Sequence, residues 1–360
     1  MGALVNEQYK DLIVYVPGKP VSETERELGL SGCIKLASNE NPLGPSPKAV
    51  AAVQDYLRHG HEYPDGGAFY LKQKLANFHD IAPENLITTN GTNELIEMLI
   101  RTTMLPDENM VFGGYSFIIY KLCAMAANRE VRTVPFKDMR FDLEALAAAV
   151  DDKTKLVFLD NPNNPCGTSF SKDEFDTFLA AIPEDVLVVY DEAYWHYVDA
   201  ADYPQGFDYL QKRERFMVMR TFSKAYGLAG LRVGYGVGNK ELVGYLNKGR
   251  QPFNCNSLGQ VAALAALDDQ EHVENSVRTN KGEMKRLMGA YDALGLDYQP
   301  SQTNFLLVDF KQDIMKVFDK LLRQGVIVRP MVGYGLNTSA RVSIGTPEEN
   351  DKLLAAIPNI

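Results

Sequence analysis

Five short polar segments in the middle of the chain carry side chains that could take part in a reaction. Each follows a run of apolar residues, and they span residues 90–93, 115, 160–167, 191–194 and 221–224. Each segment alone has an ordinary structural explanation, because Asn-Gly and Asn-Pro form turns and an Asp after a strand often caps a helix. Together they supply an amine, a carboxylate, a phenol, an amide and several hydroxyl groups.

This set of groups suits a cofactor that carries both a carbonyl and a phosphate. A lysine amine forms a Schiff base with a carbonyl, and pyridoxal phosphate needs such a lysine together with a carboxylate against its pyridine nitrogen. The carboxylate keeps that nitrogen protonated, so the ring can accept electrons from a carbanion. Tyr and Asn can bond the ring oxygen, and a helix N-terminus with hydroxyls and a cation suits the phosphate.

The elements that must position these groups follow from the alternation of apolar runs and helical patterns between residues 86 and 238. The expected strands are 86–89, 110–112, 131–135, 155–159, 186–190, 216–219 and 231–235, with helices at 93–104, 143–150 and 172–181 among them. This alternation predicts an α/β fold with a mostly parallel, doubly wound sheet. Ligands bind at the carboxyl ends of such strands, where the five polar segments lie.

The two ends of the chain predict a second, smaller domain. Residues 1–45 are irregular and rich in Pro and Gly, and we expect an arm that joins the smaller domain. Ser46 and Pro47 then have the residue types of a helix start. We expect a large cofactor-binding domain over 46–256 and a small α/β domain over 257–360. In the small domain a long helix over 261–285 precedes strands at 304–309, 326–328 and 341–344.

Composition narrows the classes of function. The 360 residues include 37 Lys plus Arg and 47 Asp plus Glu, a net charge of −10, which argues against nucleic acid as the main partner. No apolar run approaches the roughly 20 residues that cross a bilayer, and no secretory signal is visible. The four Cys form no CxxC pair, so we expect a cytoplasmic protein without a metal site. His59 and His61 are interpreted as solvated loop residues.

Three motifs give the chain a family resemblance. Residues 220–234 resemble the Schiff-base loop of fold-type I aminotransferases, with the pattern S/T-x-S-K-x-x-x-L-x-G-x-R-x-G. Residues 161–167 and 191–194 match two further signatures of that family, with Cys166 where the family usually has Thr. Segments 15–20, 36–45, 63–65, 251–257, 326–330, 334–336 and 341–346 resemble the histidinol-phosphate aminotransferase branch, although broad-range aromatic aminotransferases share these segments.

The resemblance implies a role for each cofactor residue. Lys224 would hold pyridoxal phosphate and then move a proton, Asp191 would pair with the pyridinium, and Tyr194 is the third expected catalytic residue. Tyr194 and Asn164 would bond the ring oxygen, and Tyr115 would stack on the ring face. The phosphate would be bound by Thr92, Asn93, Thr221, Ser223 and Arg232. Tyr63 would reach the phosphate of a neighbouring subunit, which makes a homodimer with shared active sites the expected assembly.

The resemblance also implies a substrate site. Arg341 resembles the residue that holds the anionic end of the substrate, because its planar fork suits a carboxylate or a phosphate. Arg329 would add a second cation, and the alternative is that Arg329 is a surface residue after a strand. Two arginines at one anion favour a substrate that carries a phosphate. Tyr15 and Asn39 of the arm would line the side where an imidazole or another aromatic ring lies.

The function that the resemblance implies is a pyridoxal-phosphate-dependent transamination between L-histidinol phosphate and 2-oxoglutarate, in histidine biosynthesis. An aromatic amino acid aminotransferase of broad specificity needs the same cofactor residues and stays open as an alternative. A decarboxylase that acts on an amino-acid phosphate also stays open. A binding module without catalytic activity is a fourth hypothesis, and the complete set of cofactor residues argues against it.

Overall fold

A seven-stranded sheet forms the larger part of the molecule. The computed structural model describes residues 4–10, 12, 14 and 18–360. The sheet has the order β2-β8-β7-β6-β5-β3-β4, built from β2 (Leu86–Thr89), β3 (Asn109–Gly113), β4 (Glu130–Val134), β5 (Thr154–Asp160), β6 (Leu187–Asp191), β7 (Phe216–Thr221) and β8 (Gly234–Gly238). Strands β4, β3, β5, β6 and β7 pair in parallel, whereas β8 is antiparallel to both β2 and β7. The predicted α/β fold with a mostly parallel sheet is therefore confirmed.

Helices cover both faces of this sheet because its strands are apolar on both sides. In β5, Leu156 and Phe158 belong to one buried cluster, while Val157 and Leu159 belong to another. The period of two sends alternate side chains to opposite faces. The first face packs against α4 (Gly91–Thr103), α5 (Ile119–Ala126) and α8 (Lys240–Gly249), and the second against α6 (Leu143–Ala148) and α7 (Lys172–Ala181).

A third buried cluster contains helices that come before and after the large sheet in the sequence. It contains residues of α2 (Pro47–Tyr56), α3 (Phe69–His79) and α9 (Ser257–Ala266). The predicted start of α2 is confirmed, since the Ser46 hydroxyl accepts a hydrogen bond from the backbone N–H of Ala49. The predicted boundary between the large and small domains at residue 257 stays a prediction, and α9 packs with α2 and α3 in this cluster.

The prediction of one helix over 261–285 is wrong. Helix α9 ends at Ala266, and α10 (Gln270–Leu294) begins after a short break. Asp269, in the break, has backbone angles outside the helical region (φ −119°, ψ 57°), and its carboxylate accepts a hydrogen bond from the Ser46 hydroxyl at 2.5 Å. Asp is a weak helix former, and its non-helical backbone here separates the two helices.

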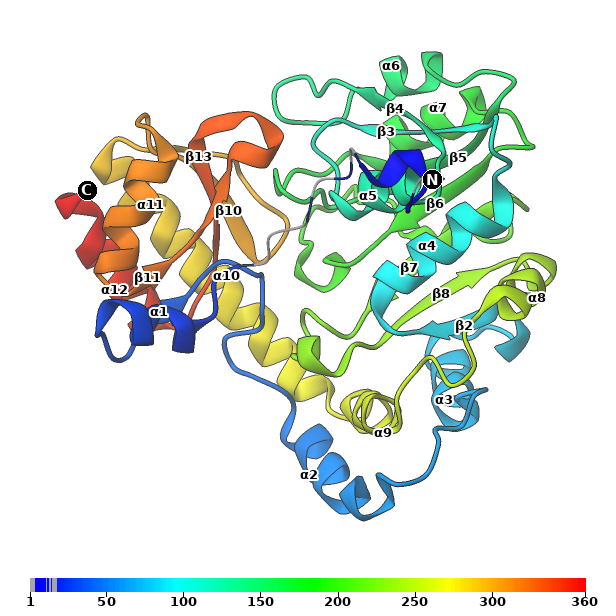
Figure 1. Ribbon diagram of the computed structural model, residues 1–360, viewed down its shortest axis with the longest axis horizontal. Coiled ribbons are helices and arrows are strands. Elements are labelled where there is room, and N and C mark those ends of the chain that lie inside the picture. The colour runs from blue at the N-terminus through cyan, green and yellow to red at the C-terminus, as the bar shows by residue number, and fades with distance from the viewer. Residues whose placement is uncertain (1–3, 11, 13, 15–17) are drawn as a thin grey trace.

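A smaller antiparallel sheet lies on the other side of the pocket described below. Its order is β12-β13-β10-β9, with β9 (Asp297–Tyr298), β10 (Phe305–Asp309), β12 (Arg329–Met331) and β13 (Leu336–Ser343). It packs with α10, α11 (Ile314–Arg323) and α12 (Pro347–Ala356). The arm joins this part, since β1 (Ile34–Lys35) pairs in parallel with β11 (Val326–Ile327) and α1 (Val21–Leu28) packs beside it. Figure 1 shows α10 running from α9 toward this second sheet.

Short elements and two negative findings complete the description. The 3-10 helices are η1 (Glu7–Tyr9), η2 (Leu57–His59), η3 (Pro83–Asn85), η4 (Trp195–Tyr197), η5 (Gly206–Tyr209), η6 (Ala229–Leu231), η7 (Val332–Tyr334) and η8 (Ile357–Asn359). Within the described ranges, no helix has both the length and the apolar character needed to span a membrane. The same residues contain no cluster of three His, Cys, Asp or Glu side chains suited to a metal ion.

Candidate active site

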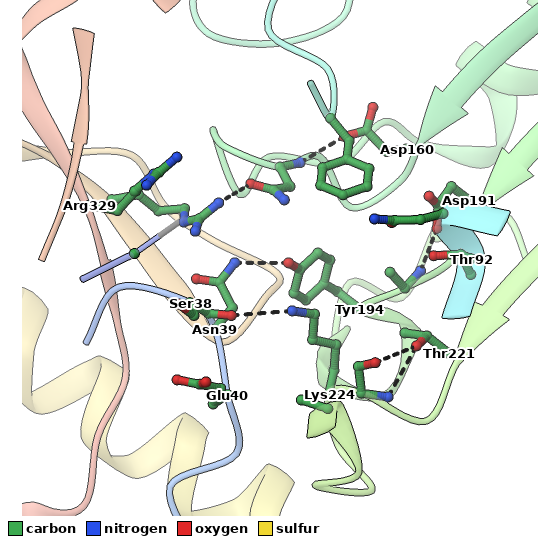
Figure 2. A pocket seen from close by; sticks show the side chains of 18 of the residues that line it. Ser38, Asn39, Glu40, Thr92, Asp160, Asp191, Tyr194, Thr221, Lys224 and Arg329 are labelled. Atoms are coloured by element: carbon green, nitrogen blue, oxygen red, sulfur yellow. Dashed lines mark hydrogen bonds between the residues drawn. The ribbon is translucent and has the colours of Figure 1, made fainter. Parts of the chain in front are cut away.

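A pocket of about 260 Å³ lies at the carboxyl ends of β5, β6 and β7, where the two sheets and the arm meet (Figure 2). Most of the residues expected in the site line it. They come from the arm, the large sheet and the small sheet, and they are Asn39, Thr92, Asn93, Asn164, Asp191, Tyr194, Thr221, Ser223, Lys224, Arg232, Arg329 and Arg341. Residues more than 300 positions apart in the sequence therefore contribute to one cavity.

Lys224 projects into this pocket from the loop after β7. Its Nζ donates a hydrogen bond to the backbone oxygen of Ser38 at 3.4 Å and lies 5.5 Å from the centre of the Tyr194 ring. Burial, assisted by the nearby Arg341 guanidinium, lowers the pKa of the Lys224 amine from 10.5 to about 7. A large share of this amine is therefore neutral near pH 7, which is the form that attacks a carbonyl carbon.

Asp191 is the last residue of β6, and its carboxylate is buried. One oxygen accepts a hydrogen bond from the Tyr120 hydroxyl at 2.8 Å, and the other accepts one from the backbone N–H of Ala193 at 3.0 Å. Burial raises the pKa of Asp191 to about 6, and these two hydrogen bonds act in the opposite direction. The carboxylate is therefore mostly ionised at neutral pH and suits a protonated ring nitrogen.

A second buried carboxylate, Asp160, lies beside Asp191 and was not singled out in the sequence. The two residues are paired at the ends of the parallel strands β5 and β6. Asp160 accepts hydrogen bonds from the Asn163 side chain at 3.0 Å and from the backbone N–H of Asn164 at 2.9 Å. Burial raises the pKa of Asp160 well above its usual range. Strand register was the signal that would have placed it here, since both strands end in Asp.

Hydroxyl groups, a guanidinium and the N-terminus of α4 converge on one side of the pocket. Arg232 has a left-handed backbone (φ 56°), and its side chain donates to the Ala229 oxygen at 3.1 Å and to the Ser223 hydroxyl at 3.4 Å. The Thr221 hydroxyl donates to Ser223 at 3.0 Å. The predicted strand 231–235 begins later, at Gly234, because residues 229–231 form η6 and Arg232 turns toward the pocket.

Two glycines leave room for this arrangement. A Cβ on Gly91 would lie 2.4 Å from the Arg232 guanidinium, and a Cβ on Gly234 would lie 2.8 Å from the backbone nitrogen of Thr92. Helix α4 therefore begins directly against β8, with its N-terminal N–H groups beside the arginine. Helix N-termini and arginines both attract phosphate. The donor set fits the phosphate of pyridoxal phosphate, just as Lys224 and Asp191 fit its carbonyl and its ring nitrogen.

The arm and the small sheet are tied to the large sheet through side-chain amides. Asn39 donates to the Tyr194 hydroxyl at 2.8 Å, and its own oxygen accepts from the Ser343 hydroxyl at 3.0 Å. Arg341 donates to the Asn164 oxygen at 2.5 Å and to the backbone oxygen of Ala37 at 2.9 Å. Burial raises the pKa of the Tyr194 phenol to about 12, so the phenol stays protonated and can donate to a cofactor oxygen.

The two arginines expected to bind the substrate lie on neighbouring strands. Arg329 in β12 and Arg341 in β13 are directly paired in the antiparallel register, and both line the pocket. Side chains at paired positions project from the same face of a sheet. This geometry favours a joint role in the pocket over the alternative in which Arg329 is a surface residue, and that role stays a prediction.

Two expected site residues, Tyr115 and Tyr63, do not line the pocket. Tyr115 packs against Phe136 and Tyr334, and Phe117 lines the pocket in its place. Tyr63 is 81% exposed and stacks on Phe253 with ring centres 4.7 Å apart. Tyr15 lies outside the described residues. Phe117 was not predicted from the sequence. It is aromatic and lies two positions after Tyr115, and only the directions of the side chains in the structure show which of the two faces the pocket.

The fold and the residues that line the pocket define a class of enzyme. A family model for class I and II aminotransferases matches residues 31–357. The chain therefore belongs to the class I and II aminotransferases and is a pyridoxal-phosphate-dependent enzyme. Within this class it groups with the histidinol-phosphate aminotransferases, as the following relatives show.

Two relatives match almost the whole chain. Histidinol-phosphate aminotransferase 1 of Nitrosococcus oceani is 46% identical over 349 residues, which cover 97% of this chain and 94% of the relative. Histidinol-phosphate aminotransferase 2 of Pseudomonas aeruginosa is 47% identical over 360 residues, covering 99% and 98%. The crystal structure of histidinol-phosphate aminotransferase from Sinorhizobium meliloti in complex with pyridoxal-5'-phosphate has a TM-score of 0.91 at 29% identity, covering 100% of this chain and 98% of that chain.

Proposed function

We propose that the enzyme transfers the amino group of L-histidinol phosphate to 2-oxoglutarate, a step of histidine biosynthesis. The observation that carries this proposal is the pairing of Arg329 with Arg341 in one pocket with Lys224. Guanidinium groups bind phosphate and carboxylate through paired hydrogen bonds, so two of them suit a doubly charged phosphate. The names of the relatives support the same substrate and favour it over an aromatic amino acid.

In this proposal the pocket residues divide the work on the cofactor. Bound pyridoxal phosphate supplies a carbonyl that joins to an amine and a ring that accepts electrons. Asp191 holds the ring nitrogen protonated, and Tyr194 and Asn164 donate to the ring oxygen. Thr92, Asn93, Thr221, Ser223 and Arg232 hold the phosphate, and Phe117, which lines the pocket where Tyr115 does not, contacts the ring.

Lys224 has a second role, in proton transfer, once its amine is free of the cofactor. Because its pKa is lowered to about 7, Nζ can accept a proton from the Cα of the substrate and can also return one. Arg341 and Arg329 hold the anionic end of the substrate, so that Cα stays within reach of Nζ. Asn39 and Tyr15 would line the side where the imidazole lies.

We further propose a cytoplasmic homodimer in which Tyr63 of the partner subunit contacts the cofactor phosphate. Phe253, which stacks on Tyr63, is 46% exposed in the single chain, and Phe69 and Tyr70, a few residues after Tyr63 in the sequence, are 58% and 73% exposed. Surfaces of this kind commonly bind another protein chain. The proposed cytoplasmic location is supported by the four cysteines, all of which are free thiols, as expected in a reducing compartment.

Steady-state kinetics with two amino donors test the proposed substrate. We expect kcat/KM for L-histidinol phosphate to exceed that for L-phenylalanine at least tenfold, with 2-oxoglutarate as acceptor. A tenfold preference for phenylalanine, equivalent to about 1.4 kcal/mol, would instead identify an aromatic amino acid aminotransferase. Release of carbon dioxide from an amino-acid phosphate would identify a decarboxylase.

A further inference from the structure

Tyr120 is a buried tyrosine that the proposed mechanism does not use, and it contacts the carboxylate at the end of β6. It lies in α5 with none of its side chain exposed, and its hydroxyl donates to Asp191 at 2.8 Å. Its ring stacks on Phe158 with ring centres 4.6 Å apart. It packs in T-shaped contacts with Phe112 and Phe117, whose ring centres lie 6.0 and 5.8 Å from its own. These aromatic contacts fix the direction in which the hydroxyl points.

Asp191 has few other donors to stabilise its charge. In the part of the chain that the structure describes, its hydrogen bonds come from Tyr120 and from the backbone N–H of Ala193. The other groups that face it are the carboxylate of Asp160 on β5, Glu192 and Tyr194 in the segment after β6, and the amine of Lys224. Of these neighbours Glu192 repels the charge of Asp191, so the Tyr120 hydroxyl offsets this repulsion as well as the effect of burial.

We propose that Tyr120 is a positioning residue for cofactor binding, whose hydroxyl keeps Asp191 ionised and aimed at the ring nitrogen. The inference rests on the proposed role of Asp191 and adds a group that does not line the pocket. A phenol that donates to a carboxylate favours the charged form, and it also fixes which oxygen stays available to a second donor. Helix α5 thereby contributes to a site built mainly from the loops after the strands.

The variant Tyr120→Phe removes the hydroxyl and keeps the ring that packs against Phe158. The pKa of Asp191 should then rise from its present value of about 6, because one hydrogen bond to the charged form is lost. If the pKa of Asp191 rises by about one unit, the ionised fraction of this carboxylate at pH 6 falls from about a half to about a tenth. At pH 8.5 the carboxylate remains ionised in both proteins, so the loss should be smaller there.

The measurement is the dissociation constant of pyridoxal phosphate, titrated into the full-length apoenzyme at about pH 6 and about pH 8.5. We expect Tyr120→Phe to weaken binding about fivefold more at the lower pH than at the higher one, relative to the unsubstituted protein. Tyr209→Phe is the matched control, because Tyr209 is a buried tyrosine that donates to Asp176, a carboxylate that does not line the pocket. It should leave both constants unchanged within twofold.

Two further variants separate the possible failures. Asp191→Asn alone should strongly weaken the binding of pyridoxal phosphate. An unchanged dissociation constant in this variant would overturn the proposed role of Asp191 itself. In the Asp191→Asn background, Tyr120→Phe should have no additional effect, because its partner is no longer charged. The inference on Tyr120 is overturned if the two effects multiply, or if the loss in Tyr120→Phe is equal at both pH values. A loss matched by a lower unfolding temperature but insensitive to pH would show a purely structural role.

Discussion

The two sides of the pocket are built in different ways. On the cofactor side, the groups come from consecutive strand ends of one sheet, and short-range hydrogen bonds hold many of them, such as Thr221 to Ser223. On the substrate side, Asn39, Arg329 and Arg341 come from the arm and the small sheet. Their positions depend on contacts between distant segments, such as Asn39 with Tyr194 and Arg341 with Asn164.

This difference separates two tasks within one site. The cofactor side uses groups that a single folded sheet positions, so a common chemistry can be kept while other parts vary. The substrate side belongs to a part of the chain with its own sheet and its own buried cluster. Substitutions on the two sides should therefore change different measured constants, and the following variants test that expectation.

The largest effect is expected for Lys224→Ala, which removes the reactive amine of the cofactor side. The kcat for transamination should fall by about ten-thousandfold or more, because no other amine within the pocket lining is placed to move the Cα proton. Visible absorption by the lysine-bound cofactor should also be lost. Transamination near the normal rate in this variant would contradict the assignment of Lys224.

A smaller effect is expected for Arg341→Lys on the substrate side. The lysine keeps the charge but cannot bond both Ala37 and Asn164 or grip an anion with two parallel hydrogen bonds. We expect kcat/KM for histidinol phosphate to fall about a hundredfold, and the dissociation constant of pyridoxal phosphate to change less than threefold.

Arg286→Lys is the matched control for that variant. Arg286 pairs with Glu283 and Asp351 and does not line the pocket, so both constants should stay unchanged. The proposed separation of the two sides is wrong if Arg341→Lys weakens binding of pyridoxal phosphate by as large a factor as it lowers kcat/KM for histidinol phosphate.

Asn39→Ala should have a moderate effect at the contact between the arm and the cofactor side. The variant removes the hydrogen bonds to Tyr194 and Ser343, and it also replaces a residue with positive φ (54°). We expect kcat/KM to fall about tenfold and the unfolding temperature to fall by a few degrees. An unchanged kcat/KM would show that the arm does not shape the substrate side.

The last expected effect concerns stability rather than turnover, and it lies in the pH dependence of the apoenzyme. The Lys224 amine titrates at a pKa of about 7 when folded and near 10.5 when unfolded. Between these values the unfolded chain binds more protons, so the free energy of unfolding should rise with pH, by up to about 1.4 kcal/mol per pH unit. Denaturant titrations from about pH 7.5 to 9.5 should show this contribution in the unsubstituted protein and its loss in Lys224→Met.

The exposed lysine Lys153 provides the control for that measurement. Lys153→Met should keep the slope of stability against pH that the unsubstituted protein shows. If Lys224→Met keeps the same slope as well, the amine is not displaced toward its neutral form in the folded apoenzyme, and its proposed readiness to accept a proton fails.

The cofactor side could be predicted from sequence because its residues follow apolar strands directly. The alternation of short apolar runs with helical patterns places Asn164, Asp191 and Lys224 at one edge of the sheet. Asp160 was missed because only the register of β5 with β6 makes it a neighbour of Asp191. Tyr120 was missed because a single buried tyrosine in a helix has no signal that distinguishes it from core.

The substrate side could be predicted only through the family resemblance. Nothing in the spacing of Arg329 and Arg341 indicates that they are paired, since the short helix η7 lies between their strands and the register shifts after Pro330. The break between α9 and α10 was not predicted either, and Asp269 in that break contacts Ser46, more than 200 residues earlier in the sequence.

The central claim is that Arg329 and Arg341 together recognise a phosphate. The most direct measurement is the ratio of kcat/KM for L-histidinol phosphate to that for L-histidinol, in the unsubstituted enzyme and in Arg329→Ala. The account predicts a large ratio that falls at least tenfold in Arg329→Ala, with the dissociation constant of pyridoxal phosphate unchanged within twofold. A ratio that Arg329→Ala leaves unchanged would contradict it.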